Sequence, residues 1–467
     1  QNYIHLIKLQ PSFRTDPEQF FNGKGENDPA FSARDRINRA PKSLGFVVLS
    51  PRISITPAGQ ALLTSKRKEE VFFRQMLKFQ IPSPYHKPTA KATSFWVKPY
   101  LELLRLVRTM GTLKFDELQI FGMQLTDWRN FENIVQKIEA FRIAKVEHQG
   151  SYKAFKAEYL RNELTRIFEE RIMNGETQTR ESSDASLDKF LRTQSSNMRD
   201  YADACFRYLR ATGLVNVSHV GKSLSIVPER IEDVDYILQT IDRSPCFIDN
   251  EKDYIEYLGN ATVPQLLTDD RQKLVAKLHA EFPQVVFNQE VEISELKDLL
   301  ADLTEQRKTD TLSRQVVEIK DYKLYDDIQN TFKQIENKEL YDAPLMLEWN
   351  TWRAMTMLDG GEIKANLNFD DFGKPLSTAQ GNMADIVCDY GDYMLIVEVT
   401  MASGQKQYDM EGEPVSRHLG KMKKTSGKPC YCLFIAPTIN EACIAHFYTL
   451  HRTNISYYGG KSTIIPL

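Results

Sequence analysis

The chain has 467 residues, a net charge of −3 and 42% hydrophobic residues. This length exceeds what one hydrophobic core supports, so we expect several domains, and the composition excludes a disordered chain. The sequence contains no run of 18 or more apolar residues and no secretory signal pattern, so we expect neither a membrane span nor secretion. The six cysteines lack metal-ligand spacing, and we interpret them as reduced thiols.

Charge is distributed unevenly along the chain. Residues 1–115 carry 19 Lys and Arg against 8 Asp and Glu, a net charge of +11, so the remainder carries −14. A basic N-terminal part joined to an acidic remainder favours a module that binds a polyanion. Ordinary variation of surface charge is the alternative explanation.

Two segments have the pattern of a winged helix. In residues 43–63, two short β-branched runs flank a turn, and Thr56 is expected to cap a helix that has Pro57 at its first position. In residues 197–228, a helix stops at Gly213 and is followed by two strands across a turn. We therefore predict two winged-helix-type subdomains.

Basic residues accompany both patterns. Such side chains can hold phosphates, and an arginine can read a guanine edge in the major groove. Those on the predicted helix of the second pattern could instead form its solvated face. The candidate DNA contacts are Arg34, Arg36, Arg39 and Lys42 at the first pattern, and Arg199, Arg207, Arg210 and Lys222 at the second.

Two further stretches precede the C-terminal part. Residues 176–196 are polar and rich in Ser and Thr, which predicts a loop. Residues 266–340 combine apolar positions at helical spacing with charges, which predicts a helical linker.

The last 130 residues predict a mixed sheet flanked by helices. We expect a helix at about 345–358, a polar loop, a β-hairpin, a helix at about 413–424 and a strand at 430–437. A further helix and a short strand complete the chain.

Two carboxylates face each other across the predicted hairpin. Gly391-Asp392 suits a two-residue turn, and counting from it pairs Asp385 with Glu398, with Cβ atoms about 4.5–5.5 Å apart. Like charges so placed repel each other. A Mg²⁺ ion held by the carboxylate oxygens and water would turn this repulsion into a net stabilisation. The carbonyl of Val399 is a further candidate ligand. Alternatively, both residues are edge-strand charges that oppose aggregation.

Other polar residues follow this pair. Glu411 and His418 are seven positions apart and would share a helix face if the helix begins that early, where either can orient a water or relay a proton. His418 could equally be a surface histidine, and Glu348, beside two tryptophans, a structural residue. The nearby bases that could hold phosphate are Arg417, Lys421, Lys423 and Lys424.

These motifs resemble a known family. They are EWNTW at 348–352, GNMADI and EVT within 381–400, MEGEPVSRH at 410–418 and CLFIAP at 432–437. The arrangement resembles the AlwI-type type IIS restriction endonucleases, which have a PD-(D/E)XK nuclease core and include nicking members. Upstream similarity extends the resemblance over most of the chain.

The resemblance implies a sequence-specific DNA endonuclease of the prokaryotic cytoplasm. It would cut double-stranded DNA at a fixed distance from an asymmetric site, with one or two Mg²⁺ ions per active site and one strand cut per site. Double-strand cleavage would need a second nuclease domain, from a transient homodimer or a small partner subunit. The implied fold is multidomain α+β: winged-helix-type recognition subdomains at 1–98 and 99–265, a helical linker at 266–340, and an α/β nuclease domain at 341–467.

By matching positions, the resemblance also implies the site residues. The active site would comprise Glu348, Asp385, Glu398, Glu411 and His418, with Asp385, Glu398 and the Val399 carbonyl as metal ligands.

One departure from the wider nuclease superfamily concerns Thr400, which stands where the ExK lysine is expected, as it does in AlwI-type members. His418, Glu411, Lys421 or a second metal ion would have to replace that lysine. Members of the family extend past the final strand, so either a C-terminal segment is missing here or this member is shorter.

Two other functions fit the sequence less closely. One is a winged-helix DNA-binding regulator with a non-catalytic C-terminal domain, which would bind DNA without cutting it. The other is a repair or transposon nuclease with little sequence preference, which would cut at scattered positions.

Overall fold

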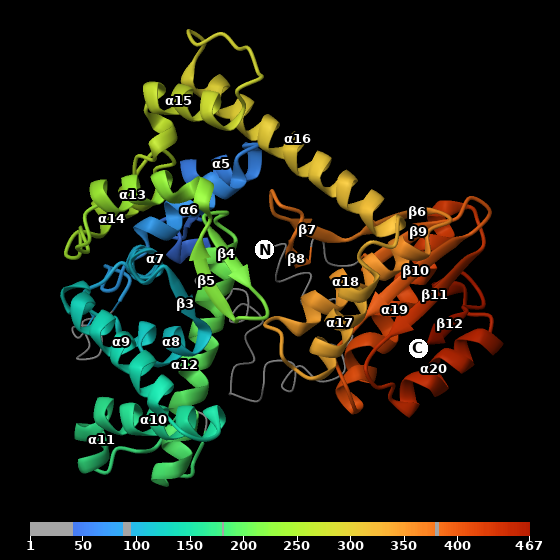
Figure 1. Ribbon diagram of the computed structural model, residues 1–467, viewed down its shortest axis with the longest axis horizontal. Helices are drawn as coiled ribbons and strands as arrows, with labels where there is room; N and C mark the ends of the chain where they lie inside the picture. The colour runs from blue at the N-terminus through green and yellow to red at the C-terminus, as the bar shows by residue number, and fades with distance from the viewer. Residues whose placement is uncertain (1–40, 87–94, 180–181, 379–382) are drawn as a thin grey trace. The chain divides into compact units, whose positions relative to one another are not determined.

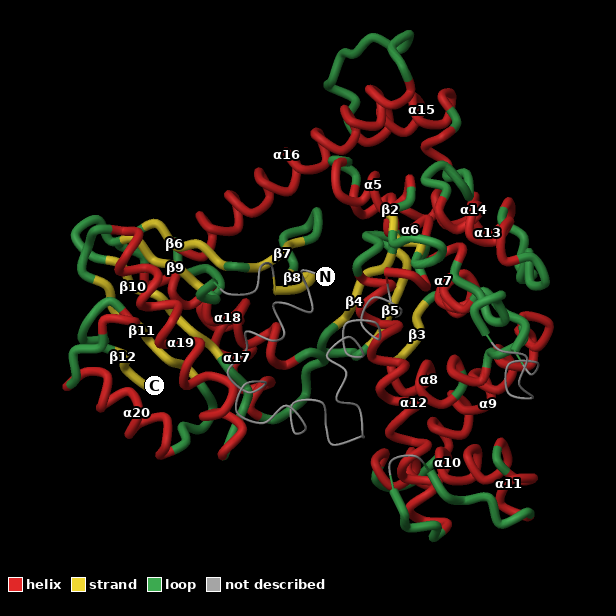
Figure 2. The backbone as a smooth tube through the Cα atoms, turned by 180° about the vertical axis from the view of Figure 1, so that it is seen from behind, coloured by secondary structure: helices red, strands yellow, loops and turns green. Residues whose placement is uncertain are grey.

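The computed structural model describes residues 41–86, 95–179, 182–378 and 383–467 (Figure 1). The chain divides into two units. Unit 1 comprises the residues up to Asn216 together with Ser223–Asp298, and unit 2 comprises Val217–Lys222 together with Leu299–Leu467. Helices and strands occur in both (Figure 2), so the protein is of the mixed helix and sheet class. No helix in these described ranges is long and apolar enough to cross a membrane.

The first described elements of unit 1 are the hairpin and the helix that the first sequence pattern predicts, followed by a second helix that it does not include. The side chain of Thr56 accepts a hydrogen bond from the backbone N–H of Gly59 at 3.0 Å, and Pro57 opens the helix, as expected from their capping preferences. Phe46 and Ala58 are buried in the core between the hairpin and the helices. The elements are β1 (Val47–Val48), β2 (Ser54–Ile55), α5 (Pro57–Thr64) and α6 (Lys68–Lys78).

The second pattern forms a three-stranded sheet with the order β3-β5-β4. Gly213 adopts a left-handed backbone (φ +68°) at the end of its long helix, as the predicted stop requires. The elements are α7 (Pro99–Met110), β3 (Thr112–Lys114), α8 (Phe115–Ile120), α12 (Leu187–Arg210), β4 (Val215–Ser218) and β5 (Ser223–Ile226). Between α8 and α12 the chain inserts α9 (Phe131–Glu147), α10 (Tyr152–Ile167) and α11 (Glu169–Met173).

The prediction of a loop at 176–196 is wrong in its second half, because α12 (Leu187–Arg210) begins at Leu187. Ser186 caps this helix by accepting a hydrogen bond from the N–H of Lys189. Phe190 and Leu191 are buried and anchor its first turns in the core. The apolar contacts outweigh the polar composition, which had favoured a loop.

The stretch expected to be a helical linker contains three long helices. The middle one, α16, contains the point at which the chain passes from unit 1 to unit 2, between Asp298 and Leu299. The elements are α15 (Arg271–Glu281), α16 (Ile293–Lys320) and α17 (Tyr325–Glu336), and they follow α13 (Ile231–Thr240) and α14 (Glu251–Gly259).

Unit 2 contains a five-stranded mixed sheet with the order β12-β11-β10-β9-β6, which confirms the predicted sheet type. The strands β10, β11 and β12 are parallel, and β9 runs antiparallel to β10 and to β6. The strands are β6 (Glu362–Ala365), β9 (Ile386–Asp389), β10 (Met394–Val399), β11 (Cys430–Ile435) and β12 (Ile464–Pro466).

Helices cover both faces of this sheet. The side chains of Val397 and Val399 pack with α17 and α18 (Ala343–Leu358), whereas Ile396 and Phe434 pack with α19 (Gln405–Ser426) and α20 (Glu441–Arg452). The result is a layer of helices on each side of the sheet.

The prediction of a polar loop after the helix at 345–358 is wrong. That segment contains β6 and a small separate hairpin of β7 (Leu367–Phe369) and β8 (Pro375–Thr378). In β6, Ile363 and Ala365 alternate with charged residues and pack against the core, which is the pattern of a half-buried edge strand.

Candidate active site

The β9–β10 hairpin has the register that counting from its turn predicts. The N–H of Tyr390 donates to the carbonyl of Tyr393 at 3.1 Å, and Gly391 supplies the left-handed backbone (φ +82°) that the turn requires. Pairing continues in that register to Ile386 opposite Val397. Asp385 is the next residue outward, and its Oδ2 accepts a hydrogen bond from the N–H of Val399 at 2.7 Å.

Strand alternation decides which face the carboxylates occupy. Val397 and Val399 pack on the α17–α18 side, so Glu398 between them points to the α19 side. Glu398 is 5% exposed. Its partner residue across the hairpin, Asp385, shares that face because directly opposed residues do.

The helix α19 supplies two more groups to the same face. It begins at Gln405, not near 413 as expected, and Pro414 lies inside it instead of in its first turn. Glu411 is therefore helical, so it and His418 lie on one helix as the earlier start requires. His418 Nδ1 lies 2.8 Å from Oε1 of Glu398, which is hydrogen-bond distance.

Thr400 lies directly after β10 and contacts the same helix. Its hydroxyl donates to Oε1 of Glu411 at 2.8 Å and accepts from the N–H of Ala402 at 3.1 Å. Thr400, which stands where a lysine was expected, therefore binds and orients the carboxylate of Glu411.

The start of α19 is tied to two loops by Gln407, which is fully buried. Its Nε2 donates to the carbonyls of Ala402 at 3.0 Å and Thr438 at 2.8 Å. Its Oε1 accepts from the N–H of Asn440 at 2.7 Å. These bonds fix the helix turn from which Glu411 projects.

Burial and mutual repulsion shift the ionisation of the carboxyl groups. Burial, with the charges of Asp385, Asp342 and others, raises the pKa of Glu348 to about 9. Burial and the charge of Glu398 raise the pKa of Asp385 to about 7, despite the hydrogen bond from Val399. Burial and the charge of Glu411 raise the pKa of Glu398 well above its usual value.

Two atoms of the cluster have no hydrogen-bond partner within the described residues. They are Nε2 of His418 and Oε2 of Glu348, and both are buried. Glu348 belongs to α18, which packs on the other face of the sheet, and it interacts with Asp385 and Glu398 through its charge. Burial and the charge of Arg417 lower the pKa of His418, which favours the neutral imidazole near pH 7.

This cluster fits a hard divalent cation. Carboxyl groups that repel one another become compatible when a cation lies among them, and oxygen ligands suit Mg²⁺. Within the described part of the chain, no group of three or more His, Cys, Asp or Glu residues is placed so that it could hold a metal ion by itself. A cation held by Asp385 and Glu398 would therefore need a backbone carbonyl, such as that of Val399, and water to complete its coordination.

The bases of α19 differ in their roles. Arg417 pairs with Glu413 one turn earlier, at 3.1 Å, and Lys421 is exposed. Lys423 donates to Oγ of Ser462 at 2.9 Å, and Lys424 donates to the carbonyl of Tyr457 at 3.0 Å. These two lysines stabilise the loop before β12 instead of facing the carboxylates.

The candidate DNA contacts also separate. Arg34, Arg36 and Arg39 lie outside the described residues. Arg199 and Arg207 are exposed on α12, where Arg207 pairs with Asp203 at 2.9 Å.

The remaining three candidates make contacts within the chain. Arg210 is buried at the end of α12, which favours a structural role over contact with DNA. Lys42 lies 4.2 Å from the ring centroid of Tyr85. Lys222 donates to the carbonyl of Lys338 at 3.2 Å.

Two residues that hold the site together were not predicted to do so. Thr400 was noted only for replacing a lysine, and Gln407 was not singled out. The motif position of Thr400 was a signal, whereas nothing in the sequence marks Gln407.

Comparison with known proteins identifies the family. The family model for AlwI restriction endonuclease matches residues 42–467. No curated protein matches the chain. Among solved structures, the small subunit (R.BspD6I2) of the heterodimeric restriction endonuclease R.BspD6I is 29% identical, over 30% of this chain and 71% of that chain, with a TM-score of 0.27.

Two other solved structures are similar at lower identity. The BpuJ1 endonuclease binding domain, in complex with modified DNA, is 14% identical over 55% of this chain and 90% of that chain, with a TM-score of 0.33. Restriction endonuclease FokI is 12% identical over 95% of this chain and 79% of that chain, with a TM-score of 0.23. Because the family model spans nearly the whole described sequence, the chain belongs to the AlwI restriction endonuclease family.

Proposed function

We propose that this protein is a Mg²⁺-dependent type IIS DNA endonuclease that cuts at a fixed distance from a short asymmetric site. Membership of the AlwI restriction endonuclease family supports a site-specific DNA endonuclease. The observation that carries the finer proposal is the group of repelling carboxyls at the end of the β9–β10 hairpin, where Glu398 contacts His418. In sheet order and site position, unit 2 would be a PD-(D/E)XK nuclease domain.

Asp385, Glu398 and the carbonyl of Val399 would hold the cation. When bound, Mg²⁺ lowers the pKa of the attacking water and neutralises the negative charge that develops on the phosphate. Asp385 is already oriented by the N–H of Val399, so the two strands hold their ligands in one rigid hairpin.

His418 would replace the lysine of the wider superfamily. Its Nδ1 is oriented by Glu398, and its Nε2 is buried without a partner among the described residues. A neutral imidazole with one free nitrogen can accept the proton of the attacking water, and its lowered pKa keeps that nitrogen unprotonated near pH 7. Thr400 would fix Glu411 beside this pair.

Unit 1 would recognise the DNA. Apart from the inserted helices α9, α10 and α11, the order around the β3-β5-β4 sheet is helix, strand, helix, helix, strand, strand. This order is typical of a winged helix, with α12 in the place of the recognition helix. Arg199 and Arg207 are exposed on α12, and Arg192 is exposed one heptad earlier. With Lys42 near the first hairpin, these cations would hold phosphates and read base edges.

The test is incubation of supercoiled plasmid with the protein and Mg²⁺, followed by run-off sequencing of both product strands. Cuts at one offset from one recurring asymmetric motif are expected. Asp385→Ala should lower cleavage by at least about 10³-fold, because it removes a ligand of the ion that activates the water. DNA binding measured in Ca²⁺ should stay within a few-fold of wild type.

Each other outcome points elsewhere. An intact plasmid that still binds the protein would favour a DNA-binding regulator. Scattered cuts would favour a nuclease with little sequence preference. Loss of DNA binding in Asp385→Ala, with the fold intact, would contradict the separation of recognition from cleavage.

A further inference from the structure

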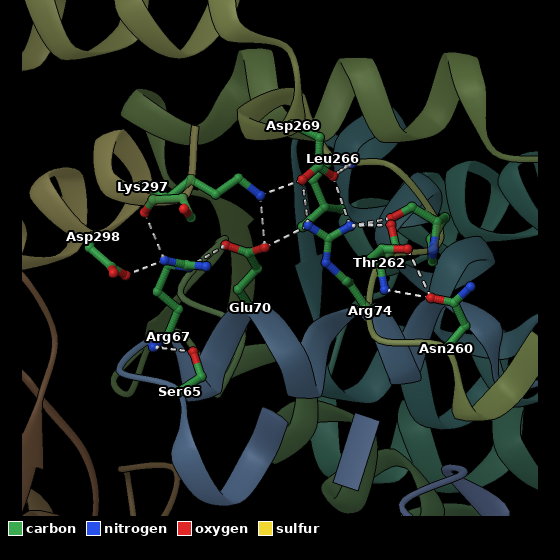
Figure 3. Close-up of polar contacts among 12 residues, drawn as sticks. Ser65, Arg67, Glu70, Arg74, Asn260, Thr262, Leu266, Asp269, Lys297 and Asp298 are labelled. Atoms are coloured by element: carbon green, nitrogen blue, oxygen red, sulfur yellow. Dashed lines mark hydrogen bonds and ion pairs between the residues drawn. The ribbon is translucent and has the colours of Figure 1, made fainter. Parts of the chain in front are cut away.

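Six charged side chains converge at the base of the long helix α16, as Figure 3 shows for the polar contacts of this region. They carry three positive and three negative charges and come from α6, from the turn before α15 and from α16 itself. We call them the base network; its members are Arg67, Glu70, Arg74, Asp269, Lys297 and Asp298.

Arg74 is the centre of the base network, and its side chain is 3% exposed. It makes two hydrogen bonds to the carboxylate of Asp269, at 2.8 and 2.9 Å, and one to Glu70 at 2.5 Å. A further bond of 3.2 Å reaches the carbonyl of Thr262. The planar guanidinium therefore fixes the relative orientation of α6 and the chain before α15.

Helix α16 joins this centre through two residues. Lys297, whose side chain is 8% exposed, contacts Asp269 and lies 3.1 Å from Oε1 of Glu70. Asp298 pairs with Arg67, which also donates to the carbonyl of Ser294 at 3.3 Å. Two neighbouring residues of α16 are thus held by partners on α6 and before α15.

The charges compensate one another closely. Burial alone would raise the pKa of Glu70, but the charges of Lys297 and Arg74 hold it below its usual value. Removing Lys297 would leave the carboxylates of Glu70 and Asp269, which are 20% and 22% exposed, with one cation fewer, and this loss would destabilise the network. Apolar packing, such as that of the buried Leu296, is non-directional and restricts the orientation of a helix less than these ion pairs and hydrogen bonds do.

The base network lies directly before the point at which the chain passes from unit 1 to unit 2. The passage from unit 1 to unit 2 follows directly after Asp298, and α16 continues to Lys320 without a glycine or proline. A helix rises about 1.5 Å per residue, so the roughly 22 residues from Asp298 to Lys320 span about 33 Å. Freedom of movement at Lys297 and Asp298 would therefore be passed on to the residues of α16 that follow them.

We propose that the base network, through Lys297 and Asp298, determines the precision of the cut position by holding the first turns of α16 in unit 1, directly before the chain passes to unit 2. Its members are positioning residues and touch neither DNA nor the reacting phosphate. This inference rests on the proposed function, because it concerns the fixed distance between recognition and cleavage.

The test compares Lys297→Met with Lys308→Met in the full-length protein. Both substitutions are on α16 and keep an unbranched side chain, but among the described residues Lys308 pairs with Glu305 on its own helix. Run-off sequencing of cleaved plasmid is expected to give one dominant offset for wild type and Lys308→Met. For Lys297→Met, the cuts should spread over at least two or three neighbouring phosphates, with plasmid binding in Ca²⁺ within about three-fold of wild type.

Hydrogen exchange provides a readout that does not depend on cleavage. Amides at 294–300 should exchange more slowly in wild type and Lys308→Met than in Lys297→Met, because the base network holds the first turns of α16. Equal protection in all three proteins would overturn the inference even if the plasmid were never cut.

The outcomes separate the two proposals. If wild type cuts at scattered positions or not at all, the proposed function fails, whereas the exchange experiment still tests the anchoring. If wild type has a fixed offset that Lys297→Met keeps, the inference alone is overturned. If Lys297→Met does not fold, Asp298→Asn replaces it, since Asp298 is 45% exposed, and an unchanged offset in that variant also overturns the inference.

Discussion

At the residue scale, Thr400 stands directly after β10 and binds a carboxylate of the neighbouring helix. Thr400 cannot supply a cation beside the attacking water, but its hydroxyl bonds Glu411, and Glu398 orients His418 in parallel. The two contacts connect the end of β10 to α19 at two points. Under the proposed function, an imidazole held by Glu398 and a carboxylate held by Thr400 would divide the task of the expected lysine.

Replacing Thr400 tests that division. Thr400→Val keeps the shape of the side chain but removes the hydroxyl, so Glu411 loses the donor that orients it. We expect the cleavage rate to fall by about 10–100-fold, as is typical when a group that orients a metal-site carboxylate is lost. Thr400→Ser, which keeps the hydroxyl, should restore most of the rate. A wild-type rate in Thr400→Val would show that the contact does not matter.

The shifted carboxyl groups predict how the stability of the metal-free protein depends on pH. A raised pKa means that the folded protein keeps a proton which the unfolded chain has released. Stability should therefore fall as the pH rises from about 4 towards about 7 for Asp385 and about 9 for Glu348. Thermal unfolding in EDTA between pH 5 and 9 measures this slope.

Glu348→Gln should flatten that slope and raise the melting temperature at pH 8 by several degrees, since about 1 kcal/mol corresponds to roughly 2–4 °C for a unit of this size. Glu362→Gln is the matched control, because the side chain of Glu362 is 67% exposed on β6. Equal slopes in both variants would contradict the assignment of the raised pKa to Glu348.

At the element scale, the parts that could be predicted are those fixed by counting. A two-residue turn sets the register of β9 and β10, so the facing of Asp385 and Glu398 followed from the position of Gly391. The cap at Thr56 was predicted for the same reason, because its partner lies three residues away.

Elements fixed by tertiary contacts could not be predicted. Helix α19 starts eight residues before the expected position because Gln407 bonds to loops far away in the sequence, which no local pattern reveals. The contact between Thr400 and Glu411 depends on that start, so it was missed as well. The start of α12 was missed because its polar residues conceal two buried ones, Phe190 and Leu191.

The attachment of α19 can be tested through Gln407. Gln407→Leu removes three partly buried hydrogen bonds, each of which contributes about 0.5–1.5 kcal/mol to stability. We expect a lower melting temperature and slower cleavage, with DNA binding in Ca²⁺ unchanged. Gln405→Leu is the control, because Gln405 is exposed and bonds only Asp409 on its own helix, and it should behave as wild type.

At the scale of the whole molecule, charge and chemistry are separated along the chain. The basic surplus lies in the first 115 residues, whereas the carboxyl cluster lies in the last 130. Residues 266–345, which contain α16, carry 11 basic and 17 acidic groups, so they have little attraction for DNA themselves. Under the proposed function, such a chain would hold its recognition site through unit 1 while unit 2 acts elsewhere on the duplex.

Within the described residues, each chain has one candidate active site, the carboxyl cluster in which Glu398 contacts His418. One chain should therefore cut one strand at a time. At protein concentrations well below that of the DNA sites, we expect nicked circles to accumulate before linear DNA. The rate of the second cut should rise with protein concentration, because a second nuclease domain must then be recruited. Adding an excess of Asp385→Ala should inhibit that second cut, since an inactive copy would compete for the same position. Simultaneous cleavage of both strands by dilute protein in a single turnover would contradict one active site per chain.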